Sequence, residues 1–323
     1  MKRILKKSSM LLCLALFAAC SSDFDEPEPP QPEQQPFPEQ IYPLTVEVTE
    51  NPMTVDGEEG SNSRRTDIAD NSSLTGFTMN YMYGASHSTG SVTASKSEEG
   101  KWTSEGSWPG GAVESNAEVS WYAYTGGTFN LNGGNPYINF TVDNDVAHQK
   151  DLLVATASGT WSGTGGQLTF AFDHACSALR FWVKKSTNIN DHTLSVTSIV
   201  LKNVVNQGQY YYDTEGWTLT VNRADYTLFS GSAQILGSTD YIAMDGGTPC
   251  YLFMIPQTLT AWNPTGDLSN TYLQLTCSID GGASQTAYIP FAATLEKGKK
   301  YNVKINIGKN SLYSGPNTKV ITE

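Results

Sequence analysis

The chain has 323 residues and a formal net charge of −12, with 32 acidic against 20 basic residues. Four of the basic residues lie within the first 20 positions, which hold no acidic residue, so the rest of the chain carries 16 basic and 32 acidic residues, a net charge of −16. This charge argues against nucleic-acid binding, which needs a positive surface, and is compatible with a solvated, surface-exposed protein.

The first 20 residues predict a bacterial secretion signal. A basic start is followed by a short apolar run at residues 10–19, too short to span a bilayer. The run ends in LFAAC at residues 16–20, which resembles the bacterial lipoprotein box, with phenylalanine where that box usually has leucine. We therefore expect a lipid on Cys20 that holds the precursor on the outer membrane. The alternative is an ordinary secretory signal with an incidental cysteine.

Residues 21–43 predict a disordered spacer between the membrane and the folded body. Seven of the 15 prolines lie between positions 27 and 43, interspersed with glutamates, and such a segment is extended and buries no core. The acidic residues directly after Cys20 resemble the signal with which Bacteroidetes-type bacteria send lipoproteins to the cell surface. A plain solvated linker is the alternative interpretation.

The folded body begins with an alternating segment. Leu44, Val46 and Val48 alternate with polar residues, which predicts a strand with one face in a sheet and the other in water. A loop of small and acidic residues follows, and then Arg64 and Arg65. Exposed loops of this kind are favoured protease sites, so this arginine pair is a candidate processing site. The alternative is an ordinary solvated loop.

The remaining body predicts an all-β fold. Short alternating or apolar runs are separated by Gly-Gly pairs, which is typical of β-sandwiches, and no long stretch keeps a helical period. The glycine-rich segment 158–166 is the best internal boundary. We therefore predict an N-terminal β-sandwich domain at 44–164 and a C-terminal one, with a short tail, at 165–323. Strands are predicted at 44–49, 118–124, 167–172, 178–184, 195–203, 217–221, 250–255, 271–279, 285–291 and 300–307.

We find no catalytic, cofactor or metal motif in the sequence. The four histidines form no H-x-x-x-H pair, and the C-x-x-C, G-x-S-x-G, Walker and Rossmann patterns are absent, so a surface hydrolase is disfavoured. His174 lies in an apolar strand and is predicted to be a hydrogen-bonded structural residue. Cys176, Cys250 and Cys277 allow at most one disulfide and are expected to be small buried side chains.

Aromatic residues leave a second function open, that of a surface glycan-binding lipoprotein. Seven tryptophans and 16 tyrosines could stack on sugar rings, although β-sandwich cores use aromatic side chains as well. Five tryptophans lie near predicted loops: Trp102, Trp108, Trp161, Trp217 and Trp262.

Six segments, in order and at matching spacing, resemble the fimbrillins of Bacteroidetes over about residues 60–307. The segment LTFAFDHACSALRF at 168–181 is similar to the family pattern VxLxFxHALSRIxF, and YLFMIPQT at 251–258 is similar to lxMIPQ. The other four segments lie at 107–124, 150–155, 196–208 and 295–304.

The resemblance implies a structural subunit of a surface fimbria or pilus, with two transthyretin-like β-sandwich domains, that supports cell adhesion. In that family an arginine-specific protease trims many of the lipoprotein precursors, which here implies cleavage at Arg64 or Arg65. Trimming removes the first strand, here about residues 44–56, and opens an apolar groove that a strand from another subunit fills. The implied partners are other fimbrial subunits, the protease, the outer membrane through Cys20, and an adhesion target.

The C-terminal tail at 311–323 is the expected strand donor of a shaft subunit. Gly315-Pro316 interrupts this tail, and Val320 and Ile321 are adjacent rather than alternating, which is a poor pattern for a donor strand. A tip subunit, or an anchor that keeps its lipid and escapes cleavage, is therefore equally open.

Overall fold

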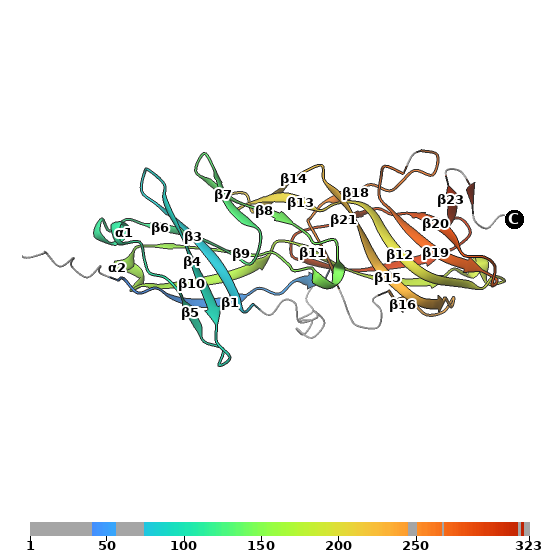
Figure 1. Ribbon diagram of the computed structural model, residues 1–323, viewed down its shortest axis with the longest axis horizontal. Helices are drawn as coiled ribbons and strands as arrows, with labels where there is room; N and C mark the ends of the chain where they lie inside the picture. The colour runs from blue at the N-terminus through green and yellow to red at the C-terminus, as the bar shows by residue number, and fades with distance from the viewer. Residues whose placement is uncertain (1–40, 56–73, 245–250, 267, 316–317, 320–323) are drawn as a thin grey trace, which may run out of the picture. The chain divides into compact units, whose positions relative to one another are not determined.

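The computed structural model describes residues 41–55, 74–244, 251–266, 268–315 and 318–319, which all belong to one compact unit. The predicted all-β class is confirmed, since the helices of these residues are limited to α1 (Gly110–Glu114), α2 (Trp161–Thr164) and 3-10 turns at Val146–His148 and Thr187–Ile189 (Figure 1). Several residues singled out from the sequence lie outside the described ranges: Cys20, Arg64, Arg65, Cys250, Val320 and Ile321.

Seven strands form the first sheet. In sheet order they are β1 (Thr45–Glu50), β10 (Gln167–His174), β9 (Leu153–Gly159), β6 (Val119–Tyr124), β3 (Gly76–Tyr83), β4 (Ser88–Lys96) and β5 (Trp102–Ser104). The sheet is barrel-like and nearly closed, because the chain just before β1 meets the chain just after β5. There Pro43 and Ser107 form a β-bridge, and the N–H of Trp108 donates to the carbonyl of Tyr42 at 3.0 Å.

The first core lies on the inner face of this sheet. Leu168, Phe170 and Phe172 of β10 are 3%, 0% and 0% exposed, whereas the residues between them face outward. The Phe77 ring of β3 contacts Phe170 and Phe172 edge to face, with ring centroids 5.6 and 5.0 Å apart. The period of two in the sequence therefore becomes one apolar face and one polar face.

The remaining strands form four further sheets. One holds β16 (Ile242–Ala243), β11 (Ser177–Lys185), β22 (Lys299–Ile307), β2 (Thr54–Val55) and β17 (Leu252–Met254). A six-stranded sheet holds, in order, β15 (Arg223–Ile235), β12 (Leu194–Val205), β19 (Tyr272–Ile279), β20 (Gln285–Pro290), β23 (Tyr313–Gly315) and β24 (Thr318–Lys319). The two smaller sheets hold β14 (Gly216–Leu219), β13 (Gln207–Tyr211), β8 (Asn135–Thr141) and β7 (Thr128–Asn132), and β18 (Thr258–Leu259) with β21 (Ala293–Thr294).

A second core is shared by these sheets, and the two cores meet just after β10. Phe172 belongs to the first core and Ala175 to the second. Ile138 and Phe140 of β8 also pack in the second core, although they precede β9 and β10 in the chain. The chain therefore visits the second core before it completes the first sheet. The division into domains at 164/165 stays a prediction.

Candidate functional site

Strand β1 alternates between the first core and solvent. Leu44 and Val46 are 6% and 7% exposed, and Val48 is half-buried and packs against the same core. Thr45 and Glu47, between them, are exposed. The three residues predicted as the apolar face of the first strand therefore do share one face, as their spacing requires.

Strand β1 runs parallel to β10 (Figure 1). The ladder joins six residue pairs, from Thr45 with Gln167 to Glu50 with Phe172. Past its end, the N–H of Asn51 donates to the carbonyl of Phe172 at 2.8 Å. Strand β1 thus pairs with a strand that lies more than one hundred residues later in the chain.

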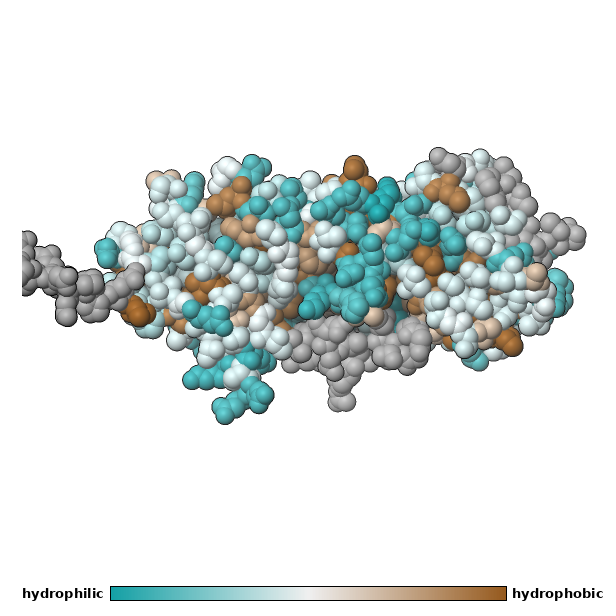
Figure 2. Space-filling model, in the orientation of Figure 1, coloured by the Kyte–Doolittle hydropathy of each residue, from teal (hydrophilic) through white to brown (hydrophobic). Residues whose placement is uncertain are grey.

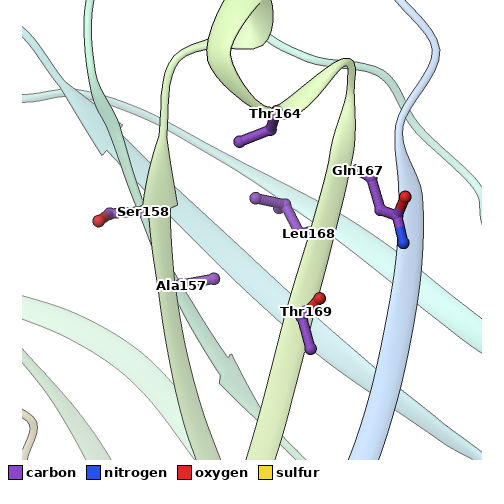
Figure 3. A pocket seen from close by; sticks show the side chains of 6 residues that line it. All are labelled: Ala157, Ser158, Thr164, Gln167, Leu168 and Thr169. Atoms are coloured by element: carbon purple, nitrogen blue, oxygen red, sulfur yellow. The ribbon is translucent and has the colours of Figure 1, made fainter.

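Strand β10 has little support on its other side. It pairs with β9 at only two positions, Asp173 with Val154 and His174 with Leu153. Beyond them the two strands separate around a cavity of about 400 Å³, which Figure 3 shows below the α2 turn. Most of the backbone pairing of β10 therefore comes from β1. The cavity is lined by Ala157, Ser158, Thr164, Gln167, Leu168 and Thr169.

Gly166 fixes the place where β1 begins. Its φ of +85° is readily accessible to glycine, and its carbonyl accepts both the Thr45 N–H at 3.0 Å and the Trp108 indole N–H at 3.2 Å. A Cβ at this position would lie 2.7 Å from the carbonyl oxygen of Pro43. Nearby, the Tyr42 ring contacts Trp161 of α2 edge to face, with centroids 6.2 Å apart.

The same segment continues into the second core through β2, a two-residue strand that the sequence did not predict. Met53 is 6% exposed and belongs to the second core, and the N–H of Thr54 donates to the carbonyl of Gly298 at 3.0 Å. Strand β2 pairs in parallel with the first residues of β22. We call residues 44–55 the first-strand segment, because this one stretch completes two sheets.

The buried side chains of the first-strand segment carry substantial stabilisation. Leu44, Val46 and Met53 are each less than 8% exposed, and burial of such a side chain contributes roughly 1.5–3 kcal/mol. A whole domain is stable by only about 5–15 kcal/mol. Loss of the segment would therefore remove a large share of the stability and leave an apolar slot.

The tail predicted as a strand donor lies on its own sheet as far as it is described. Strand β23 pairs with β20 through Tyr313 and Tyr288, and β24 folds back on β23. Leu312 is fully buried in the second core, and the Tyr313 ring contacts Trp262 with centroids 5.8 Å apart. Val320 and Ile321 follow outside the described residues.

His174 is a buried, hydrogen-bonded residue, as predicted. Its Nδ1 contacts a carboxylate oxygen of Asp151, whose other oxygen accepts the N–H of Cys176 at 3.3 Å. Cys176 and Cys277 are free and buried, and burial raises the pKa of the Cys277 thiol to about 11. Among the described residues, no group of three or more His, Cys, Asp and Glu could hold a metal ion.

The five tryptophans considered for sugar stacking do not form an exposed platform. Trp108 and Trp262 are 1% exposed, and Trp102, Trp161 and Trp217 are half-buried and pack against the two cores. On the face drawn in Figure 2, apolar residues occur in small separate groups among polar ones. Within the described ranges, no helix is long and apolar enough to cross a membrane.

These features define an all-β protein in which one N-terminal segment completes two separate sheets. A family model described as fimbrillin-like matches residues 63–321, which is most of the chain. The chain therefore belongs to the fimbrillin-like family, and the resemblance seen in the sequence is confirmed. It is therefore a fimbrial type of protein and not an enzyme.

The fold is similar to that of a fimbrial protein from Bacteroides vulgatus, with 17% sequence identity and a TM-score of 0.54 over 83% of this chain and 95% of that one. A fimbrial assembly protein from Parabacteroides distasonis matches over 84% of this chain and 94% of that one, with 9% identity and a TM-score of 0.45. The similarity to the Bacteroides vulgatus protein shows a shared fold alone. No match is found among curated proteins.

Proposed function

We propose that the chain is a fimbrial subunit that accepts a strand from another subunit after an arginine-specific protease cuts at Arg64 or Arg65. The first-strand segment supports this proposal. It precedes the arginine pair in the chain, and it pairs with a strand in each of two sheets. The family match begins at residue 63 and leaves this segment out. The part that the cut would release thus coincides with the part outside the family match.

The vacated slot would have strong reasons to be refilled. Without β1, strand β10 would keep two residue pairs with β9 and would expose the backbone groups of its other edge. The first core would lose Leu44 and Val46, and the second would lose Met53. A strand with a matching alternation restores both the hydrogen bonds and the apolar contacts, as in β-augmentation.

The geometry also sets the direction of the incoming strand. Both β1 and β2 run parallel to their neighbours, β10 and β22. A donor that reproduces these contacts therefore enters with its N-terminal end at Gly166 and its C-terminal end at β22. An extended donor advances by about 3.3 Å per residue, the same as the segment it replaces. A donor of at least 12 residues is therefore needed to replace positions 44–55.

Delivery and architecture complete the proposal. The precursor is anchored by a lipid on Cys20 and held away from the membrane by the spacer at 21–43. Its two domains are transthyretin-like sandwiches divided near 164/165. Cleavage releases the lipid together with the first-strand segment. Because β23 and β24 lie on the chain's own sheet, this subunit accepts a strand more readily than it donates one.

Treatment of the purified precursor with an arginine-specific protease tests the proposal. We expect loss of the N-terminal segment and, once fimbrial subunits that can donate a strand are added, assembly with them into larger species on gel electrophoresis. The variant Arg64→Gln/Arg65→Gln should stay monomeric, and Arg223→Gln, which alters an arginine of β15, should behave like the wild type. A protease-treated chain that loses its first-strand segment and still does not associate would contradict the proposal.

An anchor that keeps its lipid is the alternative within the family. Such an anchor keeps its own first-strand segment and can join a fimbria only by donating a strand, and the pairing of β24 with β23 disfavours that role. In that role, the chain isolated from fimbriae carries an uncut Arg64-Arg65 pair and a lipidated Cys20.

A further inference from the structure

A pocket rich in cationic and aromatic side chains lies on the outer face of the sheet built by β11 and β22. Its volume is about 430 Å³, within the range of small-ligand sites, roughly 300–1,000 Å³. Phe181 and Val183 of β11 are 3% and 1% exposed in the second core. The residues that alternate with them therefore face outward. The pocket, which we call the cationic pocket, is lined by Arg180, Trp182, Tyr241, Tyr251, Asn302 and Lys304.

Positive charge gathers at this pocket in a chain that is acidic overall. The ammonium groups of Lys184 and Lys304 both lie over the Tyr241 ring, 4.7 and 5.7 Å from its centroid. Neither lysine forms an ion pair with a carboxylate in the described part of the chain. Two like charges on one ring repel each other, and an anion placed between them would relieve that repulsion.

Two further cations are held against aromatic rings. The Arg180 guanidinium lies 4.6 Å from the Trp182 ring centroid, and the Lys300 ammonium lies 5.7 Å from that of Tyr251. Among the described residues that line the pocket, none is acidic. The pocket therefore combines guanidinium and ammonium donors, which pair with carboxylates, with aromatic surface that suits the apolar face of a ring.

The position of the pocket on a sheet face favours a saccharide over an extended peptide as its ligand. Strands β11 and β22 pair with each other along eight residues, from Ala178 with Lys300 to Lys185 with Ile307, so their facing edges are already occupied. A peptide that binds by β-augmentation needs a free strand edge, whereas this face offers side chains only. An acidic saccharide needs ring stacking and charge pairing, and both are present.

We propose that the cationic pocket binds a carboxylated saccharide of the polyuronate type. The uronate carboxylates pair with Lys184 and Lys304, and the sugar rings pack on Trp182 and Tyr241. The site gives this fimbrial subunit a ligand of its own. On β22 the pocket is lined by Asn302 and Lys304, whereas β2 of the first-strand segment pairs with Lys299 and Lys300.

Calorimetric titration of the uncleaved precursor with tetragalacturonate at low salt tests this assignment. We expect saturable binding that weakens as salt is added, because exposed charge pairs are screened. Neutralising both lysines in Lys184→Gln/Lys304→Gln should weaken binding about tenfold or more, since both charge-assisted bonds to the carboxylates are lost. The variant Lys96→Gln is the matched control, because Lys96 lies over the Trp102 ring in the first sheet at 5.9 Å; its affinity should equal that of the wild type.

Two further ligands separate the possible occupants. The carboxyl-reduced tetrasaccharide, which keeps the rings and loses the charge, should not bind. Tetraglutamate, which keeps the charge and has no sugar ring, should bind at least about tenfold more weakly than the saccharide if stacking contributes roughly 1.4 kcal/mol or more. Equal binding of tetraglutamate would reassign the pocket to acidic peptides and overturn the proposal. So would failure of tetragalacturonate to bind, or binding that the lysine substitutions leave unchanged.

Discussion

At the residue scale, a few buried side chains decide whether the first-strand segment stays in place. Leu44 and Val46 could be predicted from the sequence, because their alternation with polar residues allows one face only to be buried. The residues of the cationic pocket could not, since they lie on β11, on β22 and just before β16 and β17, segments that only the folded chain brings together. Gly166 was recognised only as part of a loop, and its role as the acceptor for Thr45 and Trp108 depends on contacts distant in sequence.

Val46→Ala tests how much the buried face of β1 stabilises the precursor. Val46 is 7% exposed, so we expect the free energy of unfolding to fall by about 2 kcal/mol. Val221→Ala is the matched control, because Val221 is 91% exposed, and its effect should stay within about 0.5 kcal/mol. Denaturant unfolding measures both. Equal effects of the two substitutions would mean that β1 does not pack as described.

His192 and Asp280 form an exposed pair whose charge state depends on pH. The hydrogen bond between His192 Nδ1 and Asp280 Oδ2, 2.7 Å long, raises the pKa of His192 above 6.5, and the same bond holds the pKa of Asp280 below 3.8. The contribution of His192 to stability is therefore complete below pH 6.5 and is lost as the pH rises through its raised pKa. That of Asp280 is complete above pH 3.8 and is lost as the pH falls through its lowered pKa.

An NMR titration of the histidine signals measures this coupling. We expect Asp280→Asn to lower the pKa of His192 back toward its ordinary value, because the hydrogen-bonding carboxylate is gone. An unchanged His192 titration in the variant would show that the pair is not formed in solution.

At the element scale, apolar alternation predicted part of the strands and missed others, such as β3 and β8, although both alternate. All ten segments predicted as strands overlap strands of the structure. Strand β4, with the sequence STGSVTASK, escaped prediction because it is rich in Ser and Thr and is held by its pairing with β3. Strand β2 escaped because two residues carry no period, and its existence depends on the distant β22.

Hydrogen exchange of β10 tests the slot itself. In the intact precursor, about half of the amides of residues 167–172 should exchange slowly, because alternate residues of β10 donate to the parallel strand β1. After cleavage and removal of the first-strand segment, exchange there should rise strongly, whereas β12, paired on both sides by β15 and β19, should change little.

A synthetic peptide of residues 41–55 provides the second half of that experiment. Added to the cleaved protein, it should restore slow exchange in β10. Slow exchange of β10 in the cleaved protein without any peptide would contradict a vacant slot.

At the scale of the whole molecule, the all-β class and the family followed from the sequence, because six ordered segments together are far more specific than any one of them. The parallel pairing of β1 with β10, and the presence of one segment in two cores, did not follow. Nothing local in the sequence specifies a pairing across more than one hundred residues. That pairing nevertheless carries the functional proposal, since it makes the segment before Arg64-Arg65 the part that closes both sheets.

The mature N-terminus of the chain in isolated fimbriae, determined by mass spectrometry, tests the central claim most directly. Cleavage at the arginine pair predicts a chain that begins at Arg65 or Thr66 and lacks the first-strand segment. A fimbrial chain that begins with a lipid-modified Cys20 and retains residues 44–55 would contradict the claim that this subunit exchanges its first strand.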